Sequence, residues 1–329
     1  MARKFIHNRK SNIRGFKPKV LNHKPRVLVI LGTTSAGKTG LGVRLAAKFK
    51  GEIVSADSRQ VYKGLDIGTG KDLADYKVGR KIIPYHLIDI VSPKTQFDLA
   101  KYQKLAFQAI NDILRRRKLP IVVGGSGLYL QALVDNYNLT GVQAQPLARK
   151  KWEKMSAARL FALVAQKKPD FAARLNNSDK NNPRRLVRYL EIIAADGLEK
   201  VGKRESPYDF LILGLNWPDK VLRARIIQRL LDRLEKQGLI AEVKRLNDAG
   251  VSWKRLQAFG LEYKFVSRHL LGGLSYQEMV EKLSTALYRF AKRQKTWFRR
   301  WEKQGVKIYW IKSFEEAKKI IKSRNSERR

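Results

Sequence analysis

The chain alternates short apolar runs with longer stretches in which apolar residues recur every three or four positions. Four of the runs are continuous and rich in aliphatic residues, which is typical of strands buried on both faces of a sheet; they cover residues 27–31, 53–54, 121–123 and 210–215. A further run over residues 306–311 predicts a final strand. Leu87, Ile88 and Asp89 fit either a strand that ends in an acid or a turn, and we favour the turn.

Helical spacing lies between these runs. It predicts a helix after the first run, helices over residues 99–117 and 183–193, and a long helix that begins at Pro218 and Asp219. Because strands and helices alternate, we expect an α/β fold in which helices flank a parallel sheet.

The most regular helical pattern lies near the C-terminus. Its apolar stripe comprises Leu283, Leu287, Phe290, Trp297 and Trp301, with Gln294 in the same register. Basic residues accompany the stripe: Arg289, Lys292, Arg293, Lys295, Arg299 and Arg300. A basic helix packed by aromatic residues suits an RNA backbone, although we expect the aromatic rings themselves to be core. Gln294 needs polar partners, which a substrate or a backbone group could supply.

Changes in composition predict the domain organisation. Residues 1–25 are basic and lack acids, so we expect a flexible arm, whether an RNA contact or a targeting segment. Residues 26–140 form the first part of the core, and residues 183–313 form its remainder with the C-terminal helices. Residues 141–182 contain short basic helical pieces, which predicts a small helical insertion. Residues 314–329 are expected to be a charged tail with a frayed end.

Charge and composition narrow the possible functions. The chain has 69 Lys and Arg against 29 Asp and Glu, a formal net charge of +40, which indicates a polyanionic partner such as nucleic acid. The alternative is a basic surface that serves solubility. The absence of cysteine excludes disulfides and thiolate chemistry. No apolar run has membrane-spanning length, and no signal-peptide pattern is present, so we expect a cytoplasmic monomer with no membrane partner.

The first apolar run leads into a phosphate-binding motif. Gly32 opens the pattern G-x-x-x-x-G-K-T, and a helical pattern follows Thr39. Glycines let backbone N–H groups converge on an anion, and a helix N-terminus adds positive charge. Lys38 would neutralise phosphate oxygens, and the Thr39 hydroxyl would hold Mg²⁺. The predicted phosphate-binding residues are Gly32, Thr33, Thr34, Ser35, Ala36, Gly37, Lys38 and Thr39.

Two further candidates follow later strands. Asp57 comes after the second run, at the sheet edge where open α/β folds bind ligands. On spacing alone it fits a general base, a Mg²⁺ ligand or a helix N-cap equally well. The segment 124–127 follows the third run, and its glycines allow either a close ligand approach or a tight turn.

Together these motifs resemble the tRNA dimethylallyltransferases, also called tRNA isopentenyltransferases. The similar blocks are GTTSAGKT from Gly32, SADSRQVYKGLDIGTGK from Ser55, PYHLIDIVSP from Pro84, PIVVGGSGLYLQAL from Pro120, NNPRRLVRYLEI from Asn181 and AKRQKTWFRRW from Ala291. They occur in the family's order over nearly the whole chain, which makes the resemblance much more specific than a P-loop alone. It implies a P-loop NTPase-like core whose helical insertion contacts tRNA.

The resemblance also implies a reaction. A dimethylallyl group passes from dimethylallyl diphosphate to the exocyclic N6 amine of the adenosine on the 3′ side of the tRNA anticodon, and diphosphate leaves, with Mg²⁺ as cofactor. Asp57 would accept the amine proton, while Lys38 and Arg229 would stabilise the diphosphate. The implied tRNA contacts are Asp57, Ser58, Arg59, Gln60, Ser126, Arg184, Arg185, Arg188, Lys292, Arg293, Gln294, Trp297 and Arg299.

The chain departs from the family pattern in three places. Thr33 stands where proline is usual, GTGKD from Gly68 replaces the common GTAKP, and AFGLEYK from Ala258 replaces the usual AIGYKE. Two other functions also fit a P-loop: a kinase of a nucleotide or small metabolite, and an RNA-binding ATPase. The kinase leaves the charge of +40 unexplained, and no clear strand ends in the acid that the ATPase needs.

Overall fold

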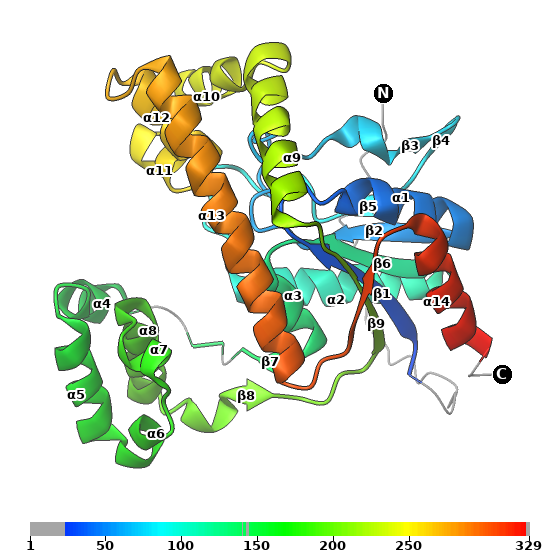
Figure 1. Ribbon diagram of the computed structural model, residues 1–329. Helices are drawn as coiled ribbons and strands as arrows, with labels where there is room; N and C mark the ends of the chain where they lie inside the picture. Colours follow the sequence, from blue (N-terminus) through cyan, green and yellow to red (C-terminus); the bar gives the residue numbers. More distant parts are fainter. Residues whose placement is uncertain (1–23, 140, 143–144, 327–329) are drawn as a thin grey trace.

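A six-stranded parallel sheet forms the centre of the protein (Figure 1). The computed structural model describes residues 24–139, 141–142 and 145–326, so the predicted arm lies almost entirely outside the described residues. The strand order is β10-β9-β1-β6-β2-β5. The strands are β1 (Arg26–Gly32), β2 (Gly51–Ser55), β5 (Tyr85–His86), β6 (Leu119–Gly124), β9 (Asp209–Leu215) and β10 (Ile308–Ile311). This arrangement confirms the predicted fold class.

The register explains why these runs contain few polar residues. Leu28 of β1 lies between Ile121 of β6 and Leu211 of β9, and the central strands are buried on both faces. β5 ends at His86, and Leu87 and Asp89 take left-handed conformations with φ of 64° and 57°. The turn that we favoured at residues 87–89 is therefore confirmed.

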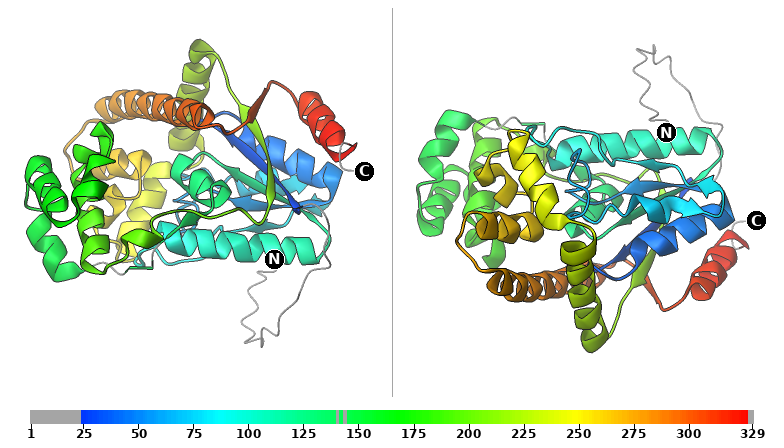
Figure 2. Two further views of the ribbon diagram at one scale, coloured as in Figure 1. Left: turned by 90° about the horizontal axis from the view of Figure 1, so that it is seen from below. Right: turned by 90° about the horizontal axis from the view of Figure 1, so that it is seen from above.

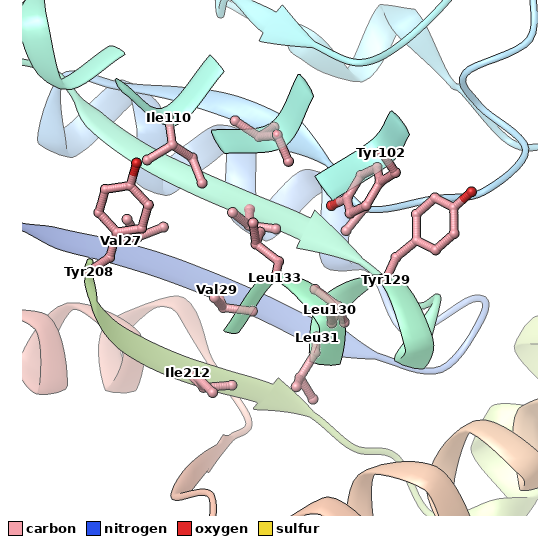
Figure 3. Packing of buried hydrophobic residues seen from close by; sticks show 14 of the residues in the cluster. Val27, Val29, Leu31, Tyr102, Ile110, Tyr129, Leu130, Leu133, Tyr208 and Ile212 are labelled. Carbon is pink, nitrogen blue, oxygen red and sulfur yellow. The ribbon is translucent and has the colours of Figure 1, made fainter. Parts of the chain in front are cut away.

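Helices cover both faces of the sheet (Figure 2). Alternate side chains of β1 pack in the layers on the two faces. Val27, Val29 and Leu31 pack against α2 (Leu99–Arg115), α3 (Gly127–Val134) and the end of α13 (Tyr276–Lys303), as Figure 3 shows for part of this cluster. Leu28 and Ile30 pack on the opposite face, against α1 (Lys38–Phe49) and α14 (Phe314–Ser326).

The helix α14 corrects one expectation. Residues 314–329 were expected to be a charged tail with a frayed end, but residues 314–326 form a helix whose Ala317 and Ile321 are buried against α1. The Arg44 guanidinium also lies 4.2 Å from the centroid of the Phe314 ring. The apolar positions were sparse among charged ones, which concealed this narrow buried stripe. Residues 327–329 lie outside the described residues.

A second helical group packs beside the carboxyl ends of the strands. It comprises α9 (Asp219–Leu231), α10 (Leu239–Asp248), α11 (Trp253–Gln257), α12 (Leu261–Leu270) and the first half of α13. A π-helical turn, Asp232–Lys236, continues α9. These helices share one apolar cluster with the loop after β2, which includes Val61, Tyr62 and Leu65. A short helical turn (Leu73–Tyr76) and the hairpin β3–β4 (Lys77–Val78, Lys81–Ile82) follow this loop.

The helical insertion stands apart from the sheet (Figure 1). It contains α4 (Pro146–Trp152), α5 (Ala157–Lys167), α6 (Pro169–Ala173), α7 (Asn177–Lys180) and α8 (Pro183–Ala194). The small ladder of β7 (Tyr137–Asn138) with β8 (Gly202–Lys203) joins it to the core. Residues 198–200 form a short 3₁₀ turn before β8.

The predicted boundary at residue 182 is wrong. We assigned α8 to the core, but its buried Leu186, Val187 and Leu190 form one apolar cluster with Leu160 and Val164 of α5. The apolar faces of α5 and α8 cover each other, so α8 belongs to the insertion, which extends to β8. Among the described residues, no helix is long and apolar enough to cross a membrane.

Candidate active site

The P-loop joins β1 to α1 as predicted, and distant side chains brace it. Gly37, at φ 87°, precedes α1, whose N-terminus has no side-chain cap. The Trp217 indole Nε1 donates to the Ala36 carbonyl at 3.0 Å, and Arg225 Nε donates to the Ser35 carbonyl at 2.9 Å. The loop therefore keeps its shape through neighbouring elements, and the helix N-terminus remains available to an anion.

Gln294 of α13 ties the P-loop to the loop after β6. Its Oε1 accepts from Thr34 N, and its Nε2 donates to the Gly125 carbonyl, both at 2.8 Å. The side chain is buried and both ends are bound to backbone groups. This supplies the polar partners that its position on the apolar stripe required.

Lys38 points back into the P-loop, and its Nζ donates to the Thr33 carbonyl at 2.6 Å. Burial and the nearby Arg229 guanidinium lower the pKa of Lys38 to about 8, although the Asp57 carboxylate acts in the opposite direction. Burial and a like charge both disfavour the ammonium form. A bound phosphate would reverse this cost, so Lys38 is suited to an anionic ligand.

Asp57 lies at the end of β2 and faces the same cavity as Lys38 and Thr39. Its Oδ1 accepts from Arg59 N at 2.8 Å, an Asx turn two residues long, and no helix begins there. The helix N-cap reading is therefore wrong. Oδ2 has no recorded hydrogen-bond partner among the residues that the structure describes, which leaves it available to a ligand.

The neighbouring residues form the wall beside Asp57. Ser58 N donates to Ser126 Oγ at 3.2 Å, which joins the loops after β2 and β6. Gln60 hydrogen-bonds Ser55 Oγ and, through Nε2, the Gly70 carbonyl at 3.0 Å. Arg59 lines the cavity with them.

The loop from Asp66 to Gly70 also borders the cavity, and a buried carboxylate holds it. Glu242 of α10, which is 1% exposed, accepts from the N–H groups of Asp66, Ile67 and Gly68 at 2.7–3.1 Å. Its Oε1 also accepts from the Tyr263 hydroxyl at 2.7 Å. Several hydrogen bonds offset the cost of burying this charge. Glu242 thereby fixes a loop that sequence alone left unexplained.

Lys71 secures the far end of the same loop. It is 1% exposed, and its Nζ donates to the Tyr62 carbonyl at 2.8 Å and to carboxylates of Asp66 and Asp89 at 2.6 and 2.5 Å. A buried ammonium requires this degree of pairing. Asp89, the acid in the turn at residues 87–89, is thus an ion-pair partner of Lys71.

Arg229 of α9 lines the cavity beside Lys38, as the resemblance implied. Its guanidinium pairs with Asp72, the residue after Lys71. Arg233, one turn farther along, is 5% exposed and pairs with Glu262 at 3.2 Å. Lys38, Arg229 and Arg233 therefore place three cations together in the lining of the cavity.

Apolar side chains complete the cavity. They come from the short turn before β3 and from α11 to α13: Tyr76, Phe259, Leu261, Tyr263, Leu287 and Phe290. Phe290 was expected to be core, but it is 38% exposed and faces this cavity. One cavity thus joins a cationic end, a carboxylate and an apolar wall.

Several predicted tRNA contacts lie elsewhere. Arg184, Arg185 and Arg188 are on α8 in the insertion, where Arg185 pairs with Asp179 and Arg188 pairs with Glu191. Lys292, Arg293 and Arg299 are exposed on α13. Trp297 is half-buried and packs so closely that a Cβ at Gly127 would lie 2.5 Å from its ring.

Sequence reasoning missed Arg233, Glu262, Glu242 and the apolar wall, because their partners are distant in the chain. The glycines at 68 and 70 were the available signal, since two glycines in three residues indicate close backbone contacts. A Cβ at Gly68 would lie 2.6 Å from the Tyr263 ring. The described residues contain no group of three or more His, Asp or Glu placed to hold a metal alone.

Comparison with known proteins gives consistent results. The family model described as IPP transferase matches residues 60–301. The chain is 45% identical over 302 residues to a tRNA dimethylallyltransferase 1 of Syntrophus aciditrophicus, covering 90% of this chain and 97% of that relative. A tRNA dimethylallyltransferase of Treponema pallidum is 43% identical over 290 residues, covering 86% and 90%.

Solved structures agree with this match. The full-length tRNA isopentenylpyrophosphate transferase of Bacillus halodurans superposes with a TM-score of 0.65 at 33% identity, covering 93% of this chain and 97% of that one. A eukaryotic dimethylallyltransferase captured in crystallographic snapshots of its action on tRNA gives a TM-score of 0.66 at 27% identity, covering 83% and 69%.

Proposed function

Because the chain belongs to the IPP transferase family, we propose that it transfers a dimethylallyl group from dimethylallyl diphosphate to tRNA. The acceptor is the N6 amine of the adenosine on the 3′ side of the anticodon, and diphosphate is released. One observation carries the proposal. The P-loop, Asp57 and Arg229 line a single cavity with an apolar wall, in a chain that is 45% identical to a tRNA dimethylallyltransferase.

The two ends of the cavity match the two ends of the donor. The N-terminus of α1 with Lys38 and Arg229 binds the diphosphate, and Phe259, Leu287 and Phe290 contact the dimethylallyl group. As the carbon–oxygen bond to diphosphate breaks, negative charge grows on the leaving oxygens, and the two cations stabilise it.

Mg²⁺ fits the same end of the cavity. Thr39 supplies a hydroxyl beside the P-loop, and Mg²⁺ favours a few protein oxygens completed by substrate phosphates and water. When bound, Mg²⁺ adds positive charge at the phosphate oxygens.

Asp57 acts at the other side of the reacting carbon. The adenosine must leave its base stack to reach a cavity between loops. Asp57 Oδ2 then accepts a proton from the N6 amine as nitrogen attacks the donor carbon, while Arg59 N holds Oδ1 in place. An aromatic amine is a weak nucleophile, so holding it against the donor supplies much of the rate.

The exposed cations Lys292, Arg293 and Arg299 of α13 contact the tRNA backbone, and so do the arginines of α8, of which Arg184 is exposed. This assignment explains the net charge of +40, which a kinase of small metabolites leaves unexplained.

The test is diphosphate release. Diphosphate formed from dimethylallyl diphosphate and Mg²⁺ should depend strictly on added tRNA, and ATP should not be consumed. ATP turnover, with or without RNA, would instead support a kinase or an ATPase.

A further inference from the structure

Arg229, one of the two cations proposed to bind the diphosphate, already has an anionic partner within the protein. Arg229 Nη2 pairs with Asp72 Oδ2, and the side chains are 34% and 29% exposed. Both residues line a second cavity that adjoins the donor cavity, since Lys38, Thr39 and Arg229 line both. The Asp72 carboxylate therefore lies where an oxygen of a bound phosphate would compete for the same guanidinium.

The backbone at this point is shaped to allow the contact. Gly70, two residues before Asp72, takes φ 63°, and a Cβ there would overlap guanidinium nitrogens of both Arg229 and Arg233. Asp72 itself is left-handed at φ 40°, a conformation that Asp and Asn tolerate better than most residues. Gly70 and Asp72, the two residues that depart from the common GTAKP pattern, thus both lie against Arg229.

The second arginine is held differently. Arg233 is 5% exposed and pairs with Glu262, which lies in the other departing block, AFGLEYK. The side chains of Arg233 and Glu262 are 6% and 15% exposed, whereas those of Arg229 and Asp72 are 34% and 29% exposed. A buried pair is costly to break and a partly exposed pair is not, so Arg229 is the arginine that can change partner.

We propose that Asp72 is a built-in competitor of the diphosphate for Arg229. In the donor-free enzyme Arg229 is paired with Asp72; on donor binding it turns to a phosphate oxygen, while Arg233 stays on Glu262. After transfer Asp72 recaptures Arg229 and weakens the hold on the released diphosphate. Asp72 thereby sets the affinity for the diphosphate end, and this role rests on the proposed function of the cavity.

The test measures binding of inorganic diphosphate by calorimetry, in excess Mg²⁺, to a four-member set: the wild type, Asp72→Asn, Arg229→Ala and the double variant. Removal of the competing charge should tighten diphosphate binding by about two- to fivefold, the size expected for a partly exposed ion pair. In the Arg229→Ala background, Asp72→Asn should have no such effect.

Asp232→Asn is the matched control. Asp232 lines the same outer cavity, but its carboxylate accepts from Lys236 Nζ at 2.6 Å and Gln228 Nε2 at 3.3 Å rather than from Arg229. The substitution removes the same charge from the same cavity and should leave the diphosphate affinity nearly unchanged.

Three results would overturn the proposal: unchanged or weaker binding in Asp72→Asn, equal tightening in Asp232→Asn, or equal tightening without Arg229. If the wild type binds diphosphate and one of these occurs, only the exchange fails. If the wild type binds no diphosphate at all, the proposed donor site fails, and the exchange fails with it.

Discussion

The cavity at the sheet edge and the helical insertion are built in opposite ways. The cavity is lined by residues from loops and helices spread over the chain, and side chains such as Gln294 and Glu242 bridge them through buried hydrogen bonds. The insertion is one continuous segment with its own apolar cluster, joined to the core through the β7–β8 ladder. Arg185 and Arg188 pair with acids of the insertion itself.

This difference in construction fits a division of roles, in which the cavity carries out the chemistry and the charged surfaces bind the tRNA. A site that must hold a base and a leaving group in register needs rigid support from several elements. A surface that holds an RNA backbone needs charge over a wide area and tolerates looser placement. We therefore expect changes in the cavity to affect rate and donor binding, and changes in the insertion or on α13 to affect tRNA binding.

The largest expected effect is on the chemical step. Asp57→Ala should lower the single-turnover rate of prenyl transfer by about a hundredfold or more, because the amine loses its proton acceptor. Diphosphate binding, measured separately by calorimetry, should remain close to that of the wild type. An unchanged single-turnover rate would reduce Asp57 to a residue that only shapes its turn.

Core substitutions in the insertion and in the sheet should have different effects on ligand binding. Leu186→Ala removes a fully buried side chain from the insertion and should destabilise it by about 2–5 kcal/mol, as such truncations generally do. Affinity for tRNA should fall while diphosphate affinity is kept. Leu213 of the sheet is also fully buried, so Leu213→Ala is the matching change in the core. Leu213→Ala should lower both the thermal stability and the affinity for diphosphate.

If Leu186→Ala lost diphosphate binding as well, the insertion and the donor cavity would not be independent.

Salt dependence tests the RNA face of α13. If about five phosphates are contacted, the plot of log affinity against log salt should slope at roughly −4. Replacing Arg293 and Arg299 by alanine should flatten that slope by about one to two units, without change in donor binding. Lys319 and Lys322 on α14 are exposed on another part of the molecule, and their replacement should leave the slope unaltered. A slope near zero in the wild type would place the tRNA elsewhere.

The smallest expected effect is a pH dependence. Because the pKa of Lys38 is lowered to about 8, its ammonium is fully charged only below that pH, and donor affinity should decline as the pH rises through 8. Arginine stays charged over this range, so Lys38→Arg should lose the decline even if its affinity is lower. If the wild type and Lys38→Arg showed the same decline in diphosphate affinity with pH, a group other than Lys38 would cause it.

Local patterns predicted the fold and part of the site. The P-loop was readable because eight consecutive residues carry its chemistry, and the buried strands were readable because they are continuous apolar runs. Arg229 was different, because only the resemblance placed it at the diphosphate. The structure puts its side chain in the cavity, and its role there stays a prediction.

The contacts that no local pattern could predict are long-range ones. Asp72 and Arg229 are 157 residues apart, and Glu242 binds a loop about as far away in sequence. The buried stripe of α14 was also missed, because its few apolar residues, such as Ala317 and Ile321, are spaced among charged ones. The boundary of the insertion failed for a related reason, since α8 has the periodicity of a core helix and only its packing partner shows which core it joins.

The proposed transfer is tested most directly by mass spectrometry of tRNA nucleosides after incubation of the protein with unmodified tRNA, Mg²⁺ and dimethylallyl diphosphate. We expect one adenosine per tRNA, next to the 3′ side of the anticodon, to gain one dimethylallyl group in place of an amine hydrogen. Asp57→Ala should yield little of this nucleoside in the same time. If the wild-type protein binds the tRNA and leaves this adenosine unmodified, the protein is not a tRNA dimethylallyltransferase.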